Sequence, residues 1–118
     1  MFGKGRREGR MIFGIDPGNL ESAFVLLNDD LTVIDKDKVS NEELLDIMHD
    51  YLQENNGPFE IDNFHVVIEK IASYGMAVGA SVFDTCIWIG RFYQYAKEFG
   101  FTPEFIYRKD EKINLCNS

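Results

Sequence analysis

Short apolar runs separated by polar turns dominate the chain and predict a sheet. The runs at 11–16, 22–28 and 65–70 are typical of strands, and 31–39 alternates apolar and polar residues as a half-exposed strand does. Short turns join the runs at 11–16, 22–28 and 31–39, which predicts an antiparallel meander of three strands. The run 104–107 predicts a fifth strand.

Two further stretches have helical spacing. Ser40, followed three residues later by Glu43, is a capping-box signature for a first helix that stops at the Asn-Asn-Gly-Pro sequence of 55–58. Its inner face is predicted to carry Leu44, Leu45, Ile47, Met48, Tyr51 and Leu52. The second helix, 82–99, is apolar nearly all round. One face must meet the sheet, and the other predicts either a homodimer contact or a helix sandwiched within its own domain.

The order of these elements indicates an α/β fold. The strand at 65–70 is reached through a helix, so we expect it to lie parallel to an earlier strand after a right-handed crossover. Alternating Asp and Lys residues at 35–38 suit an edge strand, where charge discourages stray pairing. We therefore expect a five-stranded mixed sheet, three antiparallel strands followed by two parallel ones, flanked by helices.

Composition limits the kind of protein. The 118 residues suffice for one domain, and 45% hydrophobic and 14% aromatic content argue against disorder. No apolar run approaches the roughly 20 residues that span a bilayer, and no signal-peptide core is present, so we expect no membrane partner and a cytoplasmic location. Cys86 and Cys116 are too few for a disulfide framework and are not spaced as metal ligands. We expect Cys86 to be a buried, inert thiol.

Charge is unevenly distributed. The net charge of -8 opposes phosphate binding, yet residues 1–10 carry a balance of +3, and most acids fall within 29–62. We interpret residues 1–10 as a disordered leader before a domain at 11–118, with a basic arm that touches nucleic acid as the alternative. An acidic face can also point away from a site whose own acids hold divalent cations.

The first strand runs directly into an acid. Asp16 is followed by Pro17 and Gly18, which predicts that a buried strand ends by delivering this carboxylate into a tight turn. A carboxylate there needs a metal ion, a basic side chain or solvent, because burying an unpaired charge is costly. Capping of the turn by a solvated Asp is the structural alternative.

The strand predicted at 65–70 has the same pattern as the first, an apolar run that leads into an acid, here Glu69. If the two strands are parallel neighbours, Asp16 and Glu69 emerge side by side at the edge where open α/β sheets place ligands. Mg²⁺ typically takes one or two protein carboxylates, with waters and phosphate oxygens completing its shell. Two such ions about 3.5–4 Å apart would activate a water and stabilise the leaving oxygen of a phosphodiester. Hydrolysis of a nucleic-acid strand is the reaction that this arrangement predicts.

The sequence Gly-Ile-Asp-Pro-Gly-Asn at 14–19, the sequence Val-Ile-Glu-Lys at 67–70 and the order of elements resemble the RuvC family of Holliday-junction resolvases. The stretches Ala-Ser-Tyr-Gly-Met at 72–76 and Trp-Ile-Gly-Arg-Phe at 88–92 resemble the small RuvC-like resolvases of bacteriophages that infect Gram-positive bacteria. The resemblance covers 11–118. It implies an RNase H-like fold, a homodimer, dependence on Mg²⁺ with Mn²⁺ as a substitute, and cleavage of branched double-stranded DNA.

The resemblance also implies roles for individual residues. Asp16 matches the first catalytic acid of the family and Glu69 the second, so both are expected to be metal ligands. Tyr74 is the candidate for an aromatic side chain inserted at the junction centre. The DNA-binding residues implied in this way are Lys70, Tyr74, Arg108, Lys109 and Lys112.

One departure from the family bears on activity. Family members complete the site with one or two Asp residues on a C-terminal helix, and no acid follows Lys112. We therefore expect a resolvase truncated before its final helix. A catalytically weak or inactive relative that binds branched DNA is the second interpretation. A nucleotide-binding member of the broader fold is the third, although such proteins need a second lobe.

Overall fold

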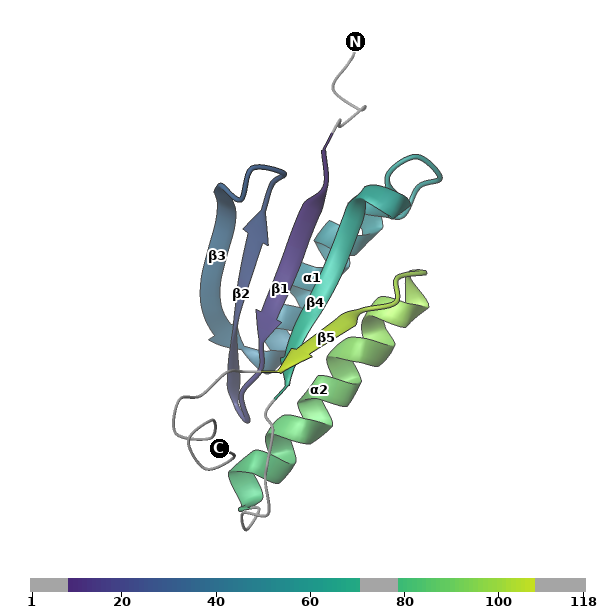
Figure 1. Ribbon diagram of the computed structural model, residues 1–118. Coiled ribbons are helices and arrows are strands. Elements are labelled where there is room, and N and C mark those ends of the chain that lie inside the picture. Colours follow the sequence, from purple (N-terminus) through teal and green to yellow (C-terminus); the bar gives the residue numbers. More distant parts are fainter. Residues whose placement is uncertain (1–8, 71–78, 108–118) are drawn as a thin grey trace, which may run out of the picture.

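The computed structural model describes residues 9–70 and 79–107. Five strands form one sheet in the order β3-β2-β1-β4-β5 (Figure 1). The elements in chain order are β1 (Met11–Asp16), β2 (Glu21–Leu27), β3 (Val33–Ser40), α1 (Asn41–Asn55), the short 3₁₀ helix η1 (Ile61–Asn63), β4 (Phe64–Lys70), α2 (Ala80–Glu98) and β5 (Glu104–Tyr107). The five-stranded sheet flanked by helices confirms the expected fold class.

The sheet is mixed in the way the sequence predicts. β1 pairs antiparallel with β2, and β2 pairs antiparallel with β3. β4 lies on the other side of β1 and parallel to it, and β5 lies parallel to β4. The chain crosses from the meander to β4 through α1, so the change from antiparallel to parallel pairing occurs at β1. The charged residues 35–38 lie on the edge strand β3, as expected.

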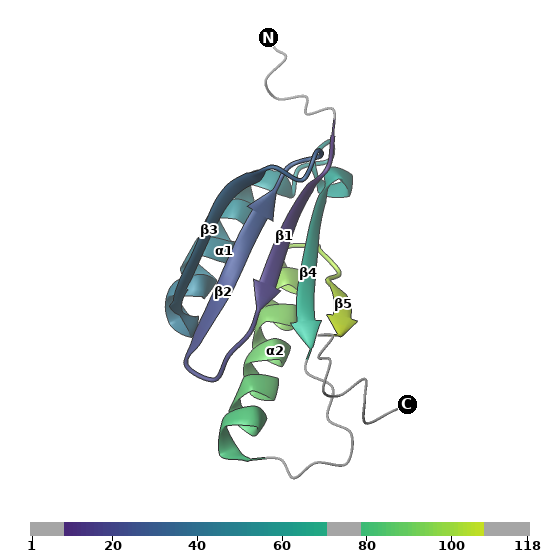
Figure 2. The ribbon, with the colours of Figure 1, turned by 60° about the vertical axis from the view of Figure 1, so that its left-hand side comes forward.

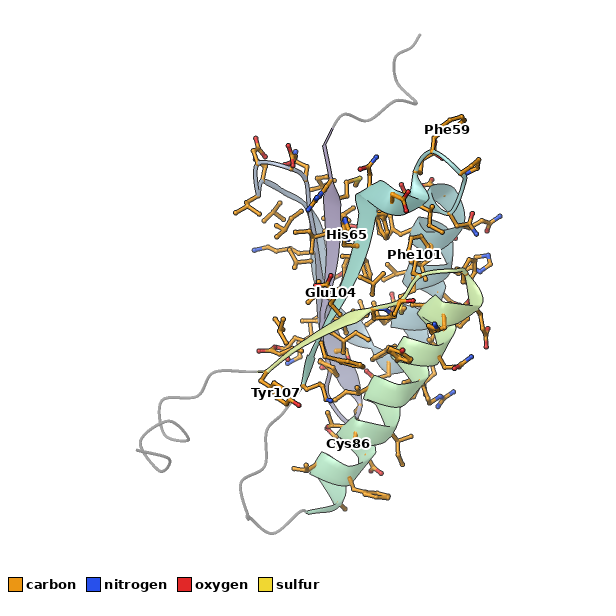
Figure 3. The ribbon with its side chains drawn as sticks, turned by 45° about the vertical axis from the view of Figure 1, so that its right-hand side comes forward. Phe59, His65, Cys86, Phe101, Glu104 and Tyr107 are labelled. Atoms are coloured by element: carbon orange, nitrogen blue, oxygen red, sulfur yellow. The ribbon has the colours of Figure 1, made fainter. Side chains whose placement is uncertain are left out.

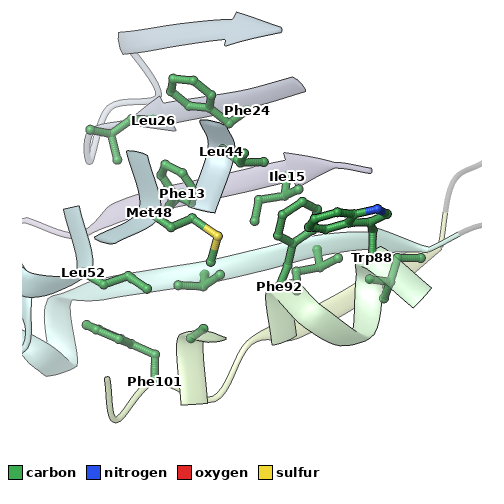
Figure 4. Packing of buried hydrophobic residues seen from close by; sticks show 14 of the residues in the cluster. Phe13, Ile15, Phe24, Leu26, Leu44, Met48, Leu52, Trp88, Phe92 and Phe101 are labelled. Carbon is green, nitrogen blue, oxygen red and sulfur yellow. The ribbon is translucent and has the colours of Figure 1, made fainter. Parts of the chain in front are cut away.

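Both helices cover the same face of the sheet (Figure 2). Alternate residues of the three central strands are buried on that face, because successive side chains of a strand point to opposite sides. They form one core with apolar residues of α1 and α2 (Figure 4). The buried apolar residues of these three strands are Phe13, Ile15, Phe24, Leu26, Phe64, Val66 and Ile68. The other face of the sheet has no helix over it among the described residues.

Helix α1 begins as the capping box predicts. The backbone N–H of Glu43 donates to the Ser40 hydroxyl at 3.1 Å, which satisfies one of the unpaired donors of the first turn. Leu44, Met48 and Leu52 are fully buried against the sheet. The predicted inner face of this helix is therefore confirmed.

Helix α2 is amphipathic in the structure, although its sequence is apolar nearly all round. Trp88, Phe92 and Ala96 are buried against the sheet, whereas Phe83 and Ile87 are exposed. The helix is therefore packed on one face, and no described residue covers its second face. The prediction of a buried Cys86 is wrong, because this thiol lies on the exposed side of the helix (Figure 3).

None of the helices in the described part of the chain combines the length and apolar character needed to cross a membrane. The link between α1 and β4 contains the single turn η1. The division into a leader at 1–10 and a domain at 11–118 remains a prediction, since residues 1–8 and 108–118 lie outside the described residues.

Candidate functional site

The two acids singled out by the sequence lie on neighbouring parallel strands. In the ladder between β1 and β4 the Cα partners run from Met11 opposite Phe64 to Ile15 opposite Ile68. The next residue on each strand is the acid, so the register brings Asp16 beside Glu69. Both point away from the core, because they alternate with the buried Ile15 and Ile68.

Asp16 and Glu69 line one shallow, open hollow on the face of the sheet that the described helices leave uncovered. Its volume is about 280 Å³. Small or apolar residues form the floor, and among the described lining residues Asp16 and Glu69 are the charged ones. The remaining lining residues are Gly14, Ile15, Ala23, Phe24, Val25, Val67 and Ile106. The expected convergence of the two acids is thus present in the geometry.

The environment of the two acids differs. Asp16 ends its strand as an exposed side chain, while the following Pro17 is buried and Glu69 is half-buried. Carboxylate oxygens are hard ligands, and two of them facing one hollow fit Mg²⁺ or Mn²⁺. Among residues 9–70 and 79–107, no three side chains of His, Cys, Asp or Glu are grouped to hold a metal ion. The described donor set is therefore the acid pair, completed by water or phosphate oxygens.

Lys70, the basic residue next to Glu69, reaches the other side of the sheet. Its ammonium lies 4.6 Å from the ring centre of Phe105 and 5.3 Å from that of Tyr107, whose position at the end of β5 is visible in Figure 3. Contacts of this kind hold a cation over the negative face of an aromatic ring. Tyr93 stacks on Phe105 from α2, with ring centres 5.3 Å apart. Lys70 therefore borders the carboxyl end of β4 without facing the hollow.

Four of the expected DNA-binding residues lie outside the described residues. They are Tyr74, Arg108, Lys109 and Lys112. Their roles remain predictions from the resemblance.

Sequence reasoning missed two polar residues beneath the site. Ser22 and Asn41 are buried and bond to the turn that follows Asp16. One signal for Ser22 was available, because it shares the inward-facing alternation of Phe24 and Leu26 in the same strand. No comparable signal marks Asn41, since a polar residue in the first turn of a helix is ordinarily exposed.

The order and directions of the strands, with the helix crossover between β1 and β4, define an RNase H-like fold. Solved structures of this fold match the chain. No protein-family model matches the sequence, and no curated protein sequence does. The fold class is therefore shown by structure alone.

Two matching structures are of RuvC. One is T. thermophilus RuvC in complex with a Holliday junction substrate, with a TM-score of 0.60, 14% identity, and coverage of 83% of this chain and 65% of that one. The other is Thermus thermophilus RuvC, with a TM-score of 0.53, 16% identity, and coverage of 82% and 63%. This chain thus spans somewhat less than two thirds of either RuvC chain, and at these identities the likeness shows the fold.

Proposed function

We propose that this chain is a divalent-metal-dependent endonuclease that cuts branched DNA such as the Holliday junction. The observation that carries this proposal is the convergence of Asp16 and Glu69 in one hollow, on a fold shared with RuvC. The matching RuvC structure holds a Holliday junction substrate, which supports branched DNA as the substrate class.

Asp16 and Glu69 are the proposed metal ligands and catalytic residues. Mg²⁺, or Mn²⁺ in its place, would supply an activated water and charge stabilisation of the leaving oxygen. The chain's own part is to hold both carboxylates at one level of the sheet, on the strands β1 and β4. The hollow is open, and the described residues of its floor are uncharged, so they put no further negative charge in the path of a phosphate group that approaches the acids.

DNA contacts beyond the scissile phosphate are proposed for the basic and aromatic residues near the carboxyl ends of β4 and β5. Lys70 is held at this end over the rings of β5. Tyr74 is proposed to enter the junction centre. The proposed phosphate contacts are Arg108, Lys109 and Lys112. Because the net charge is -8, these few cations would carry the electrostatic attraction for DNA.

A homodimer is proposed through α2. The exposed side of this helix carries Phe83 and Ile87. Gly90 lies on the same side, and a Cβ built there would meet no atom within 4 Å beyond its own helix backbone. Apolar side chains beside an open glycine would let a second helix approach closely. A two-fold dimer would also present two acid pairs, one for each of two strands to be cut.

The test is cleavage of a synthetic four-way junction in Mg²⁺ or Mn²⁺. The wild type should nick the junction, and Asp16→Asn and Glu69→Gln should each abolish nicking while leaving the fold intact. Asp62→Asn and Glu98→Gln are matched controls, because these exposed acids do not line the hollow. Cleavage that survives both site substitutions would refute the acid pair as the active site.

A second candidate function rests on one observation. The described residues contain no third metal-ligating side chain near Asp16 and Glu69. A chain that retards junction DNA in a gel, yet nicks it at no concentration of Mg²⁺ or Mn²⁺, would be a branched-DNA-binding module and not a nuclease.

A further inference from the structure

Two buried polar side chains hydrogen-bond to the turn that follows Asp16. Ser22, in β2, and Asn41, the first residue of α1, are each 1% exposed. A buried polar group is costly unless it is hydrogen-bonded, so the bonds that these two make are the reason they can lie there.

Their bonds form a closed ring around Gly18. The Gly18 N–H donates to the Ser22 hydroxyl at 3.0 Å, and the Asn41 amide donates to the Gly18 carbonyl at 3.0 Å. The Ser22 hydroxyl donates in turn to the Asn41 side-chain oxygen at 2.5 Å. Both backbone polar groups of Gly18 are therefore satisfied by side chains, and neither is left to solvent.

The N-terminal end of α1 also hydrogen-bonds to the last residue of the turn, Leu20. The backbone N–H of Asn41 donates to the Leu20 carbonyl at 2.9 Å. On the near side, Ala23, which directly follows Ser22, is the Cα partner of Asp16. The segment between Asp16 and β2 is thus tied at Gly18 and at Leu20 to one residue of α1, and it has little freedom to tilt.

We propose that Ser22 and Asn41 are positioning residues that set the direction of the Asp16 carboxylate toward Glu69. This inference rests on the proposed function, since it assigns the acid pair a metal to hold. Neither side chain lines the hollow, so each acts through the turn and not on the metal. Residues that hydrogen-bond directly to metal ligands typically change metal affinity 10–100-fold when they are removed. Because Ser22 and Asn41 act through the backbone of the turn, we expect a change near the lower end of that range.

Helix α1 itself offers a matched control. Asn55, its last residue, is also buried, at 6% exposed, and donates from its side-chain amide to the Tyr51 carbonyl at 2.8 Å. Asn41→Ala and Asn55→Ala remove the same amide from opposite ends of one helix. Only the first removal releases the turn beside Asp16.

The experiment measures Mn²⁺ binding by electron paramagnetic resonance in the full chain without DNA, and urea unfolding of each variant. We expect Asn41→Ala and Ser22→Ala to weaken Mn²⁺ binding about tenfold or more. We expect Asn55→Ala to leave the affinity within about twofold, even where it lowers stability as much. Hydrogen exchange of the Gly18 amide should accelerate in Ser22→Ala and stay unchanged in Asn55→Ala.

The outcomes separate this inference from the proposed function. A wild type that binds Mn²⁺, together with Asn41→Ala and Ser22→Ala variants of equal affinity, overturns the positioning role alone. Equal loss of affinity in Asn41→Ala and Asn55→Ala also overturns it, because the loss would then follow stability. A wild type that binds no Mn²⁺ overturns both the metal site and the positioning role. If Asn41→Ala does not fold, Ser22→Ala decides by the same criteria.

Discussion

Asp16 and Glu69 stand side by side because the parallel ladder between β1 and β4 holds Ile15 opposite Ile68, and an acid follows each of these residues. The ladder arises from the crossover through α1, which returns the chain to the open side of β1. β1 is thus the strand with an antiparallel neighbour on one side and a parallel one on the other. The strand order also reverses here, because β2 and β3 lie on one side of β1 and β4 and β5 on the other. Ligands of open α/β sheets bind beyond the strand ends at such a switch point.

The acid pair predicts that divalent metal stabilises the folded chain. A cation that binds only the folded state raises the free energy of unfolding by about 2.7 kcal/mol at a hundredfold excess over its dissociation constant. Thermal unfolding of the wild type should therefore shift upward by several degrees as Mn²⁺ is added. Asp16→Asn should show almost no shift, because one of the two carboxylates is lost.

Chelation supplies the control for this prediction. With excess EDTA, added Mn²⁺ should shift the unfolding temperature of neither the wild type nor Asp16→Asn, because the chelator removes the free metal. Equal Mn²⁺ shifts in the wild type and in the Asp16→Asn/Glu69→Gln double variant would show that the metal binds elsewhere.

The sheet could be predicted because its signals are local. The residues of β1, β4 and α1 carry clear apolar patterns, and the helix between the meander and β4 required a parallel strand. The juxtaposition of Asp16 and Glu69 followed from that topology together with the position of each acid at a strand end. Local sequence and chain direction thus sufficed for the frame of the site.

Features that depend on which surface another element covers could not be predicted. Cys86 lies in an apolar helix, and its exposure is decided by how α2 rotates onto the sheet. The ring of Ser22, Gly18 and Asn41 joins residues up to 23 positions apart, and single polar residues give no pairing signal. These contacts exist only once the helix and the hairpin have packed.

Two glycines predict opposite effects of substitution by alanine. A Cβ at Gly18 would lie 2.2 Å from the backbone carbonyl oxygen of Glu21, so Gly18→Ala must distort the turn beside Asp16. We expect it to destabilise the fold by about 1–3 kcal/mol. A Cβ at Gly90, inside α2, would meet no atom within 4 Å other than the backbone of its own helix, and Gly90→Ala should stabilise the chain by about 0.5–1 kcal/mol.

Urea unfolding at low protein concentration measures the free energy of unfolding of each variant against that of the wild type. A Gly18→Ala variant as stable as the wild type would mean that the turn relaxes freely, contrary to its hydrogen-bonded ring. Gly90→Ala serves as the matched control, since it adds the same methyl group to the same protein.

The open side of α2 predicts a dimer that can be separated without unfolding the chain. Phe83 is 61% exposed and Ile87 is 47% exposed, so replacing both by Gln should change monomer stability by less than about 1 kcal/mol. In sedimentation velocity the wild type should be a dimer and the Phe83→Gln/Ile87→Gln variant a monomer. The matched control replaces Phe59 and Ile34 by Gln, because these are exposed apolar residues outside α2. A wild type that sediments as a monomer, or a control that dissociates equally, would contradict the α2 interface.

Tyr51 predicts a loss of stability at alkaline pH. Burial, and then the Asp35 carboxylate that accepts its hydroxyl at 2.5 Å, raise the pKa of Tyr51 from 10.0 to about 12. Between these values the folded chain keeps the phenol proton while the unfolded chain releases it, so the free energy of unfolding falls as pH rises from 10 to about 12.

Urea unfolding across this window should show a shallower decline for Tyr51→Phe. At neutral pH this variant should lose about 1 kcal/mol of stability, because its hydrogen bond to Asp35 is removed. Asp35→Asn, which keeps the burial but removes the charge, should have an intermediate slope. Identical slopes for the wild type and Tyr51→Phe would show that this tyrosine does not govern the alkaline decline.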